Sequence, residues 1–500
     1  MRTEHAMAHQ VTGEPAASTA RVAVETNGIN VISESERKGT PRQLFWPWFG
    51  ANVSVLGLAY GAFTLGFGIS FWQAVVAGVV GIVVSFLLCG FIAIAGKRGS
   101  APTLVLSRAA FGVTGGKVPA VLAWVLTVGW ETVLTSLATL ATATVFTELG
   151  WGGGTATQVV ALLVVAGLVV VGGVLGFDLI MRMQAVITVV TGVLTVVYLV
   201  LVADEIDWGT VSGLPSGSTQ AFIGALVFVM TGYGFGWVNA AADYSRYLPR
   251  SASTRGVVGW TTFGSALAPV VLLVVGLLLA GSSADLATAI GADPIGALAT
   301  LLPTWFLVPF ALVAVLGLVG GALLDIYSSG LALLAAGVRI PRPVAASIDG
   351  VLMVLGAIWV VFLAEGDFFV QFQGFLITLG VPVAAWCGIV LADLLLRHRD
   401  YAEADLYDPR GRYGAVPPVP LALLVLGTVL GWGLVTNGYA SWLTWQGYLL
   451  EPLGLGGKDG TWAFANLGVL VALVVGFAGT LLLRRGAVRR QEALAPQEAR

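Results

Sequence analysis

Residues 230–247, MTGYGFGWVNAAADYSRY, are the stretch that decides the fold, because Gly232, Gly234 and Gly236 interrupt an apolar segment there. Glycine inside a helix costs about 1 kcal/mol relative to alanine. Backbone that lacks hydrogen bonds costs more than this in lipid, unless it lines a cavity inside the protein. The stretch therefore predicts a membrane-spanning helix that is broken beside an internal cavity.

A second glycine-rich stretch lies five predicted helices earlier. Residues 52–68, NVSVLGLAYGAFTLGFG, carry Gly57, Gly61, Gly66 and Gly68. Two broken helices at equivalent positions predict two inverted five-helix repeats, whose breaks meet near the membrane midplane. The alternative is that these glycines serve only close helix packing.

The composition places the chain in lipid. Of its 500 residues, 57% are hydrophobic and 10% are charged, whereas a soluble protein carries roughly 25% charged residues. A spanning helix needs about 20 mostly apolar residues. The sequence predicts twelve such spans, over residues 45–69, 71–96, 118–147, 155–177, 180–203, 219–242, 257–281, 304–338, 344–364, 369–396, 417–437 and 461–483. We expect residues 99–116 on the cytoplasmic surface, and an external loop with a short helix over residues 284–301.

The basic residues predict the orientation. With the N-terminus in the cytoplasm, Lys458 is the one external residue among 25 lysines and arginines, which agrees with the positive-inside rule. We therefore expect a multi-pass inner-membrane protein with both termini in the cytoplasm and no cleavable signal peptide. The predicted organisation is a disordered tail (1–41), a first five-helix repeat (42–203), helix 6 with a cytoplasmic loop (204–256), the rest of the second repeat (257–400), helices 11 and 12 with the preceding loop (401–485) and a second tail (486–500).

Several function classes are disfavoured. A net charge of −2 offers no basic field to attract nucleic acid. None of the three histidines lies in an apolar segment, which argues against a metal site or a histidine base. Catalytic side chains do not converge at membrane depth as a membrane enzyme would need, and two broken helices disfavour a channel.

Charged residues in the predicted helices need a reason, since each costs about 2.5–3.5 kcal/mol near mid-span on insertion scales. Glu131 is predicted to be a proton carrier or a hydrogen-bond acceptor for a ligand, and the alternative is a protonated acid bonded to a neighbouring helix. Asp325 is the stronger candidate, because two serines follow it at i+3 and i+4 on one helix face. Asp243 and Arg246 have the i,i+3 spacing of an ion pair, which we expect either to be structural or to act as a gate.

Aromatic residues mark the same region. Trp130 lies in mid-helix, away from the interfacial belt that tryptophan prefers, and Tyr233, Phe235 and Trp237 crowd the break of helix 6. Aromatic side chains beside a broken helix can stack on a flat ring, although packing against lipid or core is the alternative for each one. As a group they predict a pocket.

These motifs together resemble those of the nucleobase–cation symporter family, in its purine–cytosine permease branch of cytosine, purine, uracil, thiamine and allantoin permeases. The resemblance covers residues from about 41 to 412. It rests on six stretches in order: WFGANVSVLGLAYGAF, APTLVLSRAAFG, VGWETV, ADYSRYLP, DIYSSGLAL and GVPVAAWCGIVLADLLLR.

The resemblance implies an all-α polytopic membrane protein with twelve transmembrane helices, a LeuT-like 5+5 inverted repeat and discontinuous helices 1 and 6. It implies a symporter, not an enzyme, that imports a nucleobase or a related planar nitrogen heterocycle with a cation. The ring would lie between Trp130 and Tyr233. The expected substrate site comprises Trp130, Glu131, Tyr233, Phe235, Gly61, Gly321 and Asp325, and the expected coupling-ion site comprises Glu131, Asp325, Gly57 and Ser328.

The sequence departs from the family pattern where a cation would bind. Leu134 stands where many relatives have an amide, and Gly321 and Ala322 stand where relatives often have asparagine. Residues 316–324 contain no hydroxyl, whereas hard cations need several oxygen ligands. We therefore expect H⁺ as the co-transported cation, with Glu131 or Asp325 as its carrier. The alternative is a Na⁺-coupled transporter of allantoin, hydantoin, thiamine or an amino acid. We expect no cofactor, and no partner other than the small substrate and the lipid bilayer.

Overall fold

The computed structural model describes residues 25, 27–364, 368–438 and 441–494, and this part of the chain is helical without strands. Nine of its helical segments are long and apolar enough to cross a membrane. They are α3 (Phe71–Gly99), α6 (Lys117–Glu148), α7 (Thr155–Leu175), α8 (Phe177–Leu201), the run Thr219–Ser245, α13 (Thr254–Ser282), α16 (Thr304–Ala335), α17 (Arg342–Phe362) and α18 (Phe368–Leu396).

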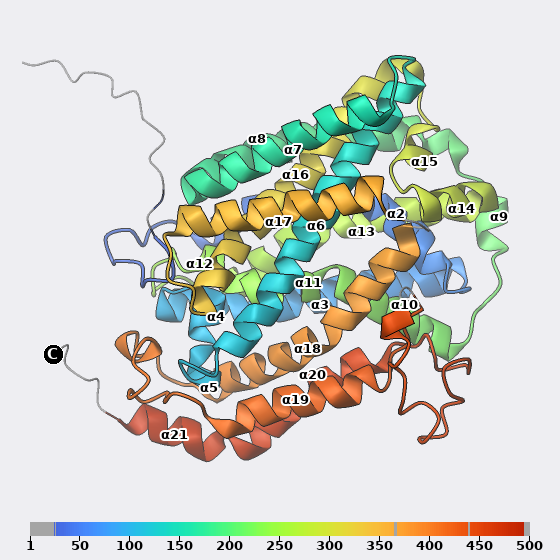
Figure 1. Cartoon of the computed structure of the whole chain (residues 1–500). Helices are drawn as coiled ribbons and strands as arrows, with labels where there is room; N and C mark the ends of the chain where they lie inside the picture. The colour runs from blue at the N-terminus through green and yellow to red at the C-terminus, as the bar shows by residue number, and fades with distance from the viewer. Residues whose placement is uncertain (1–24, 26, 365–367, 439–440, 495–500) are drawn as a thin grey trace, which may run out of the picture.

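The remaining predicted spans correspond to bent or shorter helices. They are the pair α1 (Phe45–Asn52) and α2 (Leu56–Leu65), then α19 (Pro418–Trp432), and α20 (Leu467–Leu483), which continues into α21 (Arg485–Ala493) after a bend of 57°. Each of the twelve predicted spans thus has a helical counterpart (Figure 1). The all-α polytopic fold is confirmed, while twelve crossings and the 5+5 repeat stay a prediction.

The first break lies beside the glycines and not at them. Helices α1 and α2 meet at 67°, and residues 53–55 between them are not helical. A Cβ at Gly61 would lie 2.2 Å from the carbonyl carbon of Gly276, and one at Gly57 would lie 2.9 Å from Leu272 Cβ. The close-packing alternative therefore holds for Gly61, which brings α2 against the backbone of α13.

The second break lies within the glycine cluster, as expected. It separates α10 (Thr219–Gly232) from α11 (Gly234–Trp237) at Tyr233, whose φ is −115° and ψ is −100°. Helical structure resumes in η3 (Val238–Ala240) and α12 (Ala241–Ser245). A Cβ at Gly232 would lie 2.1 Å from the Tyr60 hydroxyl, and one at Gly234 would lie 2.2 Å from the backbone of α3. These glycines leave room for neighbours at the break.

Short helices fill the connections. They are η1 (Pro41–Leu44), α4 (Thr103–Leu106), α5 (Arg108–Phe111), η2 (Ala203–Glu205), α9 (Trp208–Ser212), α14 (Ala284–Ala292), α15 (Gly296–Ala299), η4 (Ala404–Leu406) and η5 (Ser441–Leu443). Helices α14 and α15 lie in the predicted loop over 284–301. The expectation that residues 99–116 lie on the surface is wrong, because α4 and α5 are buried and Arg108 donates to the carbonyls of Leu406 and Ala335.

The predicted N-terminal tail is ordered in part, so its boundary at residue 41 is wrong. The backbone of Ile32 donates to the Ser100 carbonyl at 2.8 Å, and Arg37 donates to the carbonyls of Lys97 and Leu248. This segment pairs backbone carbonyls near the ends of helices, which otherwise lack partners. At the other terminus α21 extends into the second predicted tail. Residues 1–24, 26 and 495–500 lie outside the described residues.

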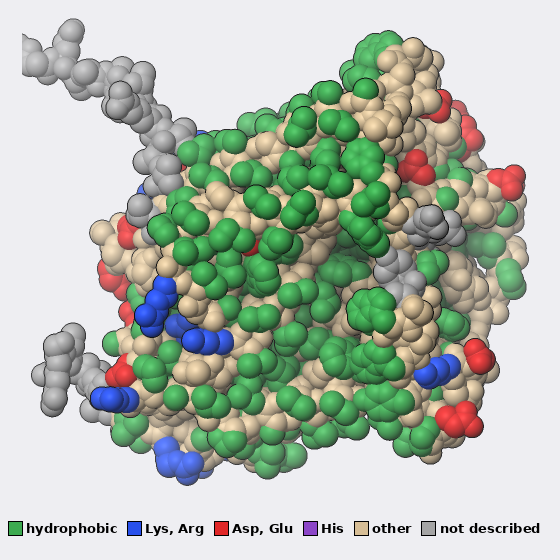
Figure 2. Space-filling model, in the orientation of Figure 1, with side chains coloured by type: hydrophobic (Ala, Val, Ile, Leu, Met, Phe, Trp, Pro, Cys, Tyr) green, Lys and Arg blue, Asp and Glu red, His purple; other side chains and the backbone are tan. Residues whose placement is uncertain are grey.

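The surface separates into a wide apolar belt and two polar ends. Exposed apolar side chains cover α7, α8 and α17, among them Leu163, Val186 and Val351. Most lysine and arginine side chains visible in Figure 2 gather at the end where α4, α5 and α21 lie, which we call the basic end. Helices α9, α14 and α15 lie at the opposite end (Figure 1). The belt between the two ends is the face that lipid would cover.

Candidate functional site

A cavity lies where the two helix breaks meet. Its volume is about 50 Å³, several times the space that one buried water molecule needs. Its walls come from α1 and α2, from α6, from the break after α10, and from α16. The lining residues are Ala51, Asn52, Ser54, Leu56, Gly57, Tyr60, Trp130, Leu134, Gly232, Tyr233, Trp237, Gly317 and Asp325. Trp130, Tyr233, Asp325 and Gly57 of the expected sites thus share one cavity.

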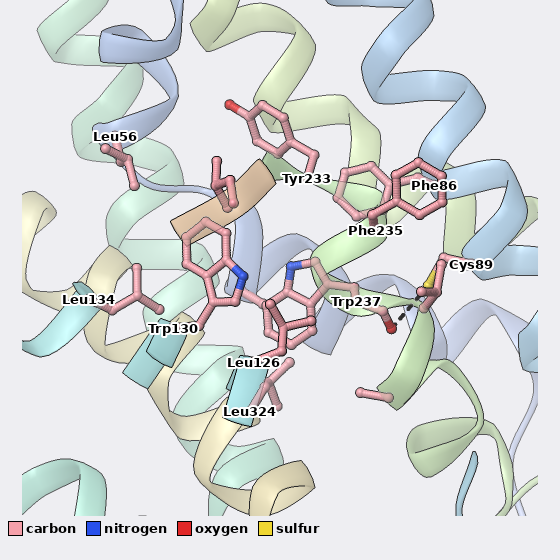
Figure 3. Close-up of a cluster of buried hydrophobic side chains, with 14 of the residues drawn as sticks. Leu56, Phe86, Cys89, Leu126, Trp130, Leu134, Tyr233, Phe235, Trp237 and Leu324 are labelled. Carbon is pink, nitrogen blue, oxygen red and sulfur yellow. Dashed lines mark hydrogen bonds between the residues drawn. The ribbon is translucent and has the colours of Figure 1, made fainter. Parts of the chain in front are cut away.

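Four aromatic side chains line the cavity, namely Tyr60, Trp130, Tyr233 and Trp237. Figure 3 shows the indoles of Trp130 and Trp237 beside each other, with Tyr233 close by. The Tyr60 ring lies against the Tyr233 ring, with centroids 4.5 Å apart. On the far side of Trp130, the Phe372 ring makes an edge contact at 5.4 Å. Flat faces in this number suit a planar ring.

The expectation that Phe235 contributes to the site is wrong, and Trp237 takes its place. Phe235 is 1% exposed, does not line the cavity and lies beside Phe86 (Figure 3). The sequence offered a signal for Trp237, because it belongs to the aromatic cluster at the break. Helical spacing could not choose between Phe235 and Trp237, because the chain is not helical at Tyr233.

Polar atoms without partners also mark the cavity. The Tyr60 and Tyr233 hydroxyls, Trp130 Nε1 and Asp325 Oδ2 are buried and make no hydrogen bond within the described residues. Buried polar groups are nearly always hydrogen-bonded in folded proteins. Four such groups on residues of one cavity leave both donors and acceptors free for water or a ligand.

Three expected site residues lie off the cavity wall. Glu131 is fully buried, and neither of its carboxylate oxygens makes a hydrogen bond within the described chain. Its electrostatic neighbours are Asp349, Ser329 and Asp325, so it faces α16 and α17. Gly61 packs on α13, and a Cβ at Gly321 would lie 2.8 Å from Leu134. Each faces a neighbouring helix and not the cavity, and their contact with substrate stays a prediction.

The junction of α1 and α16 carries several oxygen atoms. Added Cβ atoms at Gly317, Gly320 and Gly321 would lie 2.7, 2.8 and 3.4 Å from the carbonyl oxygens of Val53, Gly50 and Ala51. Gln184 of α8 donates its Nε2 to the Gly320 carbonyl at 2.5 Å, while its buried Oε1 has no partner within the described chain. A Cβ at Gly50 would lie 2.3 Å from this Oε1 and 2.8 Å from the Thr188 hydroxyl, and oxygens of these kinds can bind a hard cation. Ser328, expected as an ion ligand, is bonded instead to the Tyr244 hydroxyl at 3.1 Å.

The expected ion pair between Asp243 and Arg246 is not formed in the described structure. Asp243 Oδ1 accepts from the backbone and the hydroxyl of Thr103, both at 2.8 Å. Arg246 donates to Tyr327 at 2.8 Å and lies 3.8 Å from the carboxylate of Glu25. Spacing alone was misleading, because buried neighbours from other elements compete for both charges.

The matching family model and two similar proteins point to the same family. Residues 31–448 match the family model described as permease for cytosine/purines, uracil, thiamine, allantoin. The chain is 22% identical over 418 residues to YxlA of Bacillus subtilis, a candidate purine-cytosine permease, with 81% of this chain and 87% of YxlA covered. It is 25% identical over 245 residues to the purine-cytosine permease FCY2 of Saccharomyces cerevisiae, with 47% and 44% covered.

Solved structures show the same fold. Mhp1, a nucleobase-cation-symport-1 family transporter in a closed conformation with bromovinylhydantoin bound, superposes with a TM-score of 0.68 at 19% identity, over 96% of this chain and 98% of Mhp1. A Na⁺-coupled sialic acid symporter superposes with a TM-score of 0.59 at 11% identity, over 92% of each chain. The family match, which spans most of the chain, makes this protein a transporter and not an enzyme. The chain belongs to the family of permeases for cytosine and purines, uracil, thiamine and allantoin.

Proposed function

We propose that this protein imports a planar nitrogen heterocycle of the nucleobase or hydantoin class together with a proton. The observation that carries the proposal is the cavity at the two helix breaks, where Trp130, Tyr233 and Trp237 surround the unpartnered Asp325. The proposed orientation places the basic end in the cytoplasm of the cell that carries the protein in its membrane.

Recognition of the ring follows from the chemistry of the wall. Stacking of a base on an aromatic side chain is worth about 1–3 kcal/mol. Asp325 accepts a ring or exocyclic N–H, and the hydroxyls of Tyr60 and Tyr233 donate to ring carbonyls or nitrogens. Nucleobases and hydantoins carry N–H groups and carbonyls on one flat ring. The relatives named as purine-cytosine permeases and the hydantoin bound to Mhp1 belong to this chemical class.

The side chains available to bind a cation favour proton coupling over sodium coupling. Residues 316–324 of α16 bring no hydroxyl to the junction with α1, and Gln184 Nε2 already donates to the Gly320 carbonyl there. Asp325 and Glu131 are buried carboxylates without a cation partner in the described residues. Such groups are stable in a membrane interior chiefly as neutral acids. One proton entering through a potential of 100 mV releases about 2.3 kcal/mol, enough for roughly fifty-fold accumulation of a neutral substrate.

Uptake of radiolabelled cytosine, adenine, hypoxanthine, uracil and allantoin into proteoliposomes tests the proposal. We expect accumulation of at least one compound under an inward pH gradient, and its loss with a protonophore. Accumulation that follows a Na⁺ gradient and ignores the pH gradient would establish the alternative, a Na⁺-coupled transporter. Trp130→Ala should abolish uptake, whereas Trp305→Ala, whose indole is 65% exposed on α16, should not. Normal uptake by the Trp130 variant contradicts the pocket.

A further inference from the structure

A third buried carboxylate lies behind the cavity. Asp349 on α17 is fully buried, as is Glu131 on α6, and Asp325 on α16 is 2% exposed. Glu131 is within electrostatic reach of both other carboxylates. These three helices pack on one another. The group therefore extends from the cavity wall toward the lipid-facing helix α17.

No cation faces this group within the described chain. Helices α7 and α15 carry no charged residue, and α16 carries none besides Asp325. On α17, Arg342 donates to the carbonyls of Gly173 and Val174. On α18, Asp393 pairs with Arg397 and Arg484. On α6, Lys117 lies fourteen residues from Glu131, or about 21 Å along the helix.

Hydrogen bonds connect Asp349 to the helices that carry the other two acids. Asp349 accepts from Trp124 Nε1 at 2.7 Å and from Ser329 Oγ at 2.9 Å. Ser329 follows Asp325 by four residues, and Trp124 precedes Glu131 by seven. Both spacings keep side chains on one helix face. The unpartnered Glu131 carboxylate thus lies on the face of α6 that meets Ser329 and Asp349.

The three acids lie at different depths. Asp349 is seven residues from the start of α17, or about 10 Å from its terminus at the basic end. Glu131 is fourteen residues from the start of α6, at the same end. Asp325, on the cavity wall, is ten residues from the end of α16, or about 15 Å from the same end of the molecule. Asp349 is therefore the acid nearest the basic end.

We propose that Asp349 is the inner proton-binding group of the transport cycle. A proton that enters with the substrate binds Glu131 or Asp325 and reaches Asp349 through the hydroxyl of Ser329 before it leaves at the basic end. At each step an O–H bond forms on the acceptor oxygen as the donor's O–H bond breaks, so no other reactant is needed. This inference rests on the proposed function, since it assumes a co-transported proton.

A purely structural role for Asp349 makes a different prediction. In that case its carboxylate only ties α17 to Trp124 and Ser329, and its loss lowers stability without separating transport modes. As a proton-binding group, Asp349 is needed for net uptake, because the proton must be released inside. It is not needed for exchange of internal for external substrate, in which the carrier keeps its proton.

The test compares the two modes in proteoliposomes, with the compound from the five-member panel that the wild type accumulates most. Asp349→Asn should lower pH-driven accumulation to about one-fold and leave the exchange rate within about twofold of wild type. Ser329→Ala should slow net uptake in the same way. The control is Asp178→Asn, which removes an exposed carboxylate from the start of α8 and should change neither mode.

The outcomes separate the two proposals. Failure of the wild type to accumulate any of the five compounds overturns the proposed function and this inference with it. Equal pH-driven accumulation by the wild type and Asp349→Asn overturns the inference alone, as does equal loss of both modes with an unchanged thermal midpoint.

If Asp349→Asn does not fold, Trp124→Phe gives the answer. Trp124→Phe removes the indole N–H that favours the charged form of the Asp349 carboxylate. The pH profile of accumulation should therefore shift to higher pH, while exchange is retained. An unchanged pH profile overturns the inference.

Discussion

At the scale of single residues, Trp237 is the side chain whose role is most directly testable. It lines the cavity beside Trp130, and its backbone carbonyl accepts a weak bond from the Cys89 thiol at 3.8 Å. Trp237→Ala should weaken substrate binding by about 1–3 kcal/mol, or roughly 5- to 150-fold in Kd. Equilibrium binding to purified protein measures this. Phe235→Ala should instead lower the thermal midpoint with little effect on Kd, since Phe235 packs in the core. A larger loss of affinity in the Phe235 variant would reverse the assignment.

The sequence located part of this site because two signals were strong. Trp130 and Asp325 are costly at membrane depth, and Tyr233 stands between glycines. Composition could not show that Glu131 faces away from the cavity, since that depends on how α6 is rotated against α16 and α17. Nor could it place Tyr60, whose contact with Tyr233 depends on the angle between α1 and α2. The sequence predicted which residue types form the site, but not which side chains they contact.

At the scale of elements, the two breaks have different causes. Glycine marks both a flexible helix and a tightly packed one, so a glycine pattern cannot separate them before the neighbouring helix is known. The second break coincides with its glycines at Tyr233. The first break falls on residues 53–55, while Gly61 serves contact with α13.

Substitution of Gly61 tests this distinction. Gly61→Ala should lower the thermal midpoint strongly, because the new Cβ would lie 2.2 Å from the Gly276 carbonyl carbon and α2 would have to move away from α13. Gly259→Ala is the matched control. It also lies in a helix, α13, but its Cβ would meet nothing within 4 Å, and alanine favours the helix by about 1 kcal/mol. A midpoint for Gly61→Ala that equals wild type would show that α2 does not depend on this packing.

The ordered N-terminal segment is an element that hydropathy did not predict. Glu25 joins several helix ends at the basic end. Its carboxylate accepts from the Tyr247 hydroxyl at 2.7 Å and from the backbone of Phe177 at 2.8 Å, and it lies 3.8 Å from both Arg246 and Arg342. Burial raises the pKa of Tyr247 to about 12, so its hydroxyl remains a neutral donor at physiological pH.

Loss of Glu25 should therefore destabilise the basic end. Glu25→Ala leaves two buried arginines without their carboxylate, a change that costs about 3–5 kcal/mol. We expect a lower thermal midpoint and faster hydrogen exchange over residues 27–38. Glu34→Ala is the control, because its side chain is 73% exposed although it also contacts arginine, and its midpoint should equal wild type. Equal thermal midpoints for both variants would show that Glu25 does not stabilise the fold.

At the scale of the whole molecule, hydropathy and charge predicted more than they did for the site. The cost of placing polar groups in lipid acts on each segment separately, so every predicted span has a helical counterpart. The same cost keeps charged side chains out of the belt, and the positive-inside bias gathers the basic ones at one end (Figure 2). Contacts between distant segments, such as the burial of α4 and α5, have no such one-dimensional signal. These contacts are what place Asp325 and the aromatics around one cavity.

Orientation in the membrane is the prediction that joins the charge pattern to the direction of transport. Cys89 and Cys387 are both fully buried, so labelling of introduced cysteines meets little background. Lys458→Cys, in the exposed connection before α20, should react with a membrane-impermeant maleimide on intact cells. His398→Cys, exposed after α18 at the basic end, should react only after the membrane is opened. The reverse pattern would place the basic end outside, so that the proposed proton exit near Asp349 would face the wrong compartment for proton-driven import.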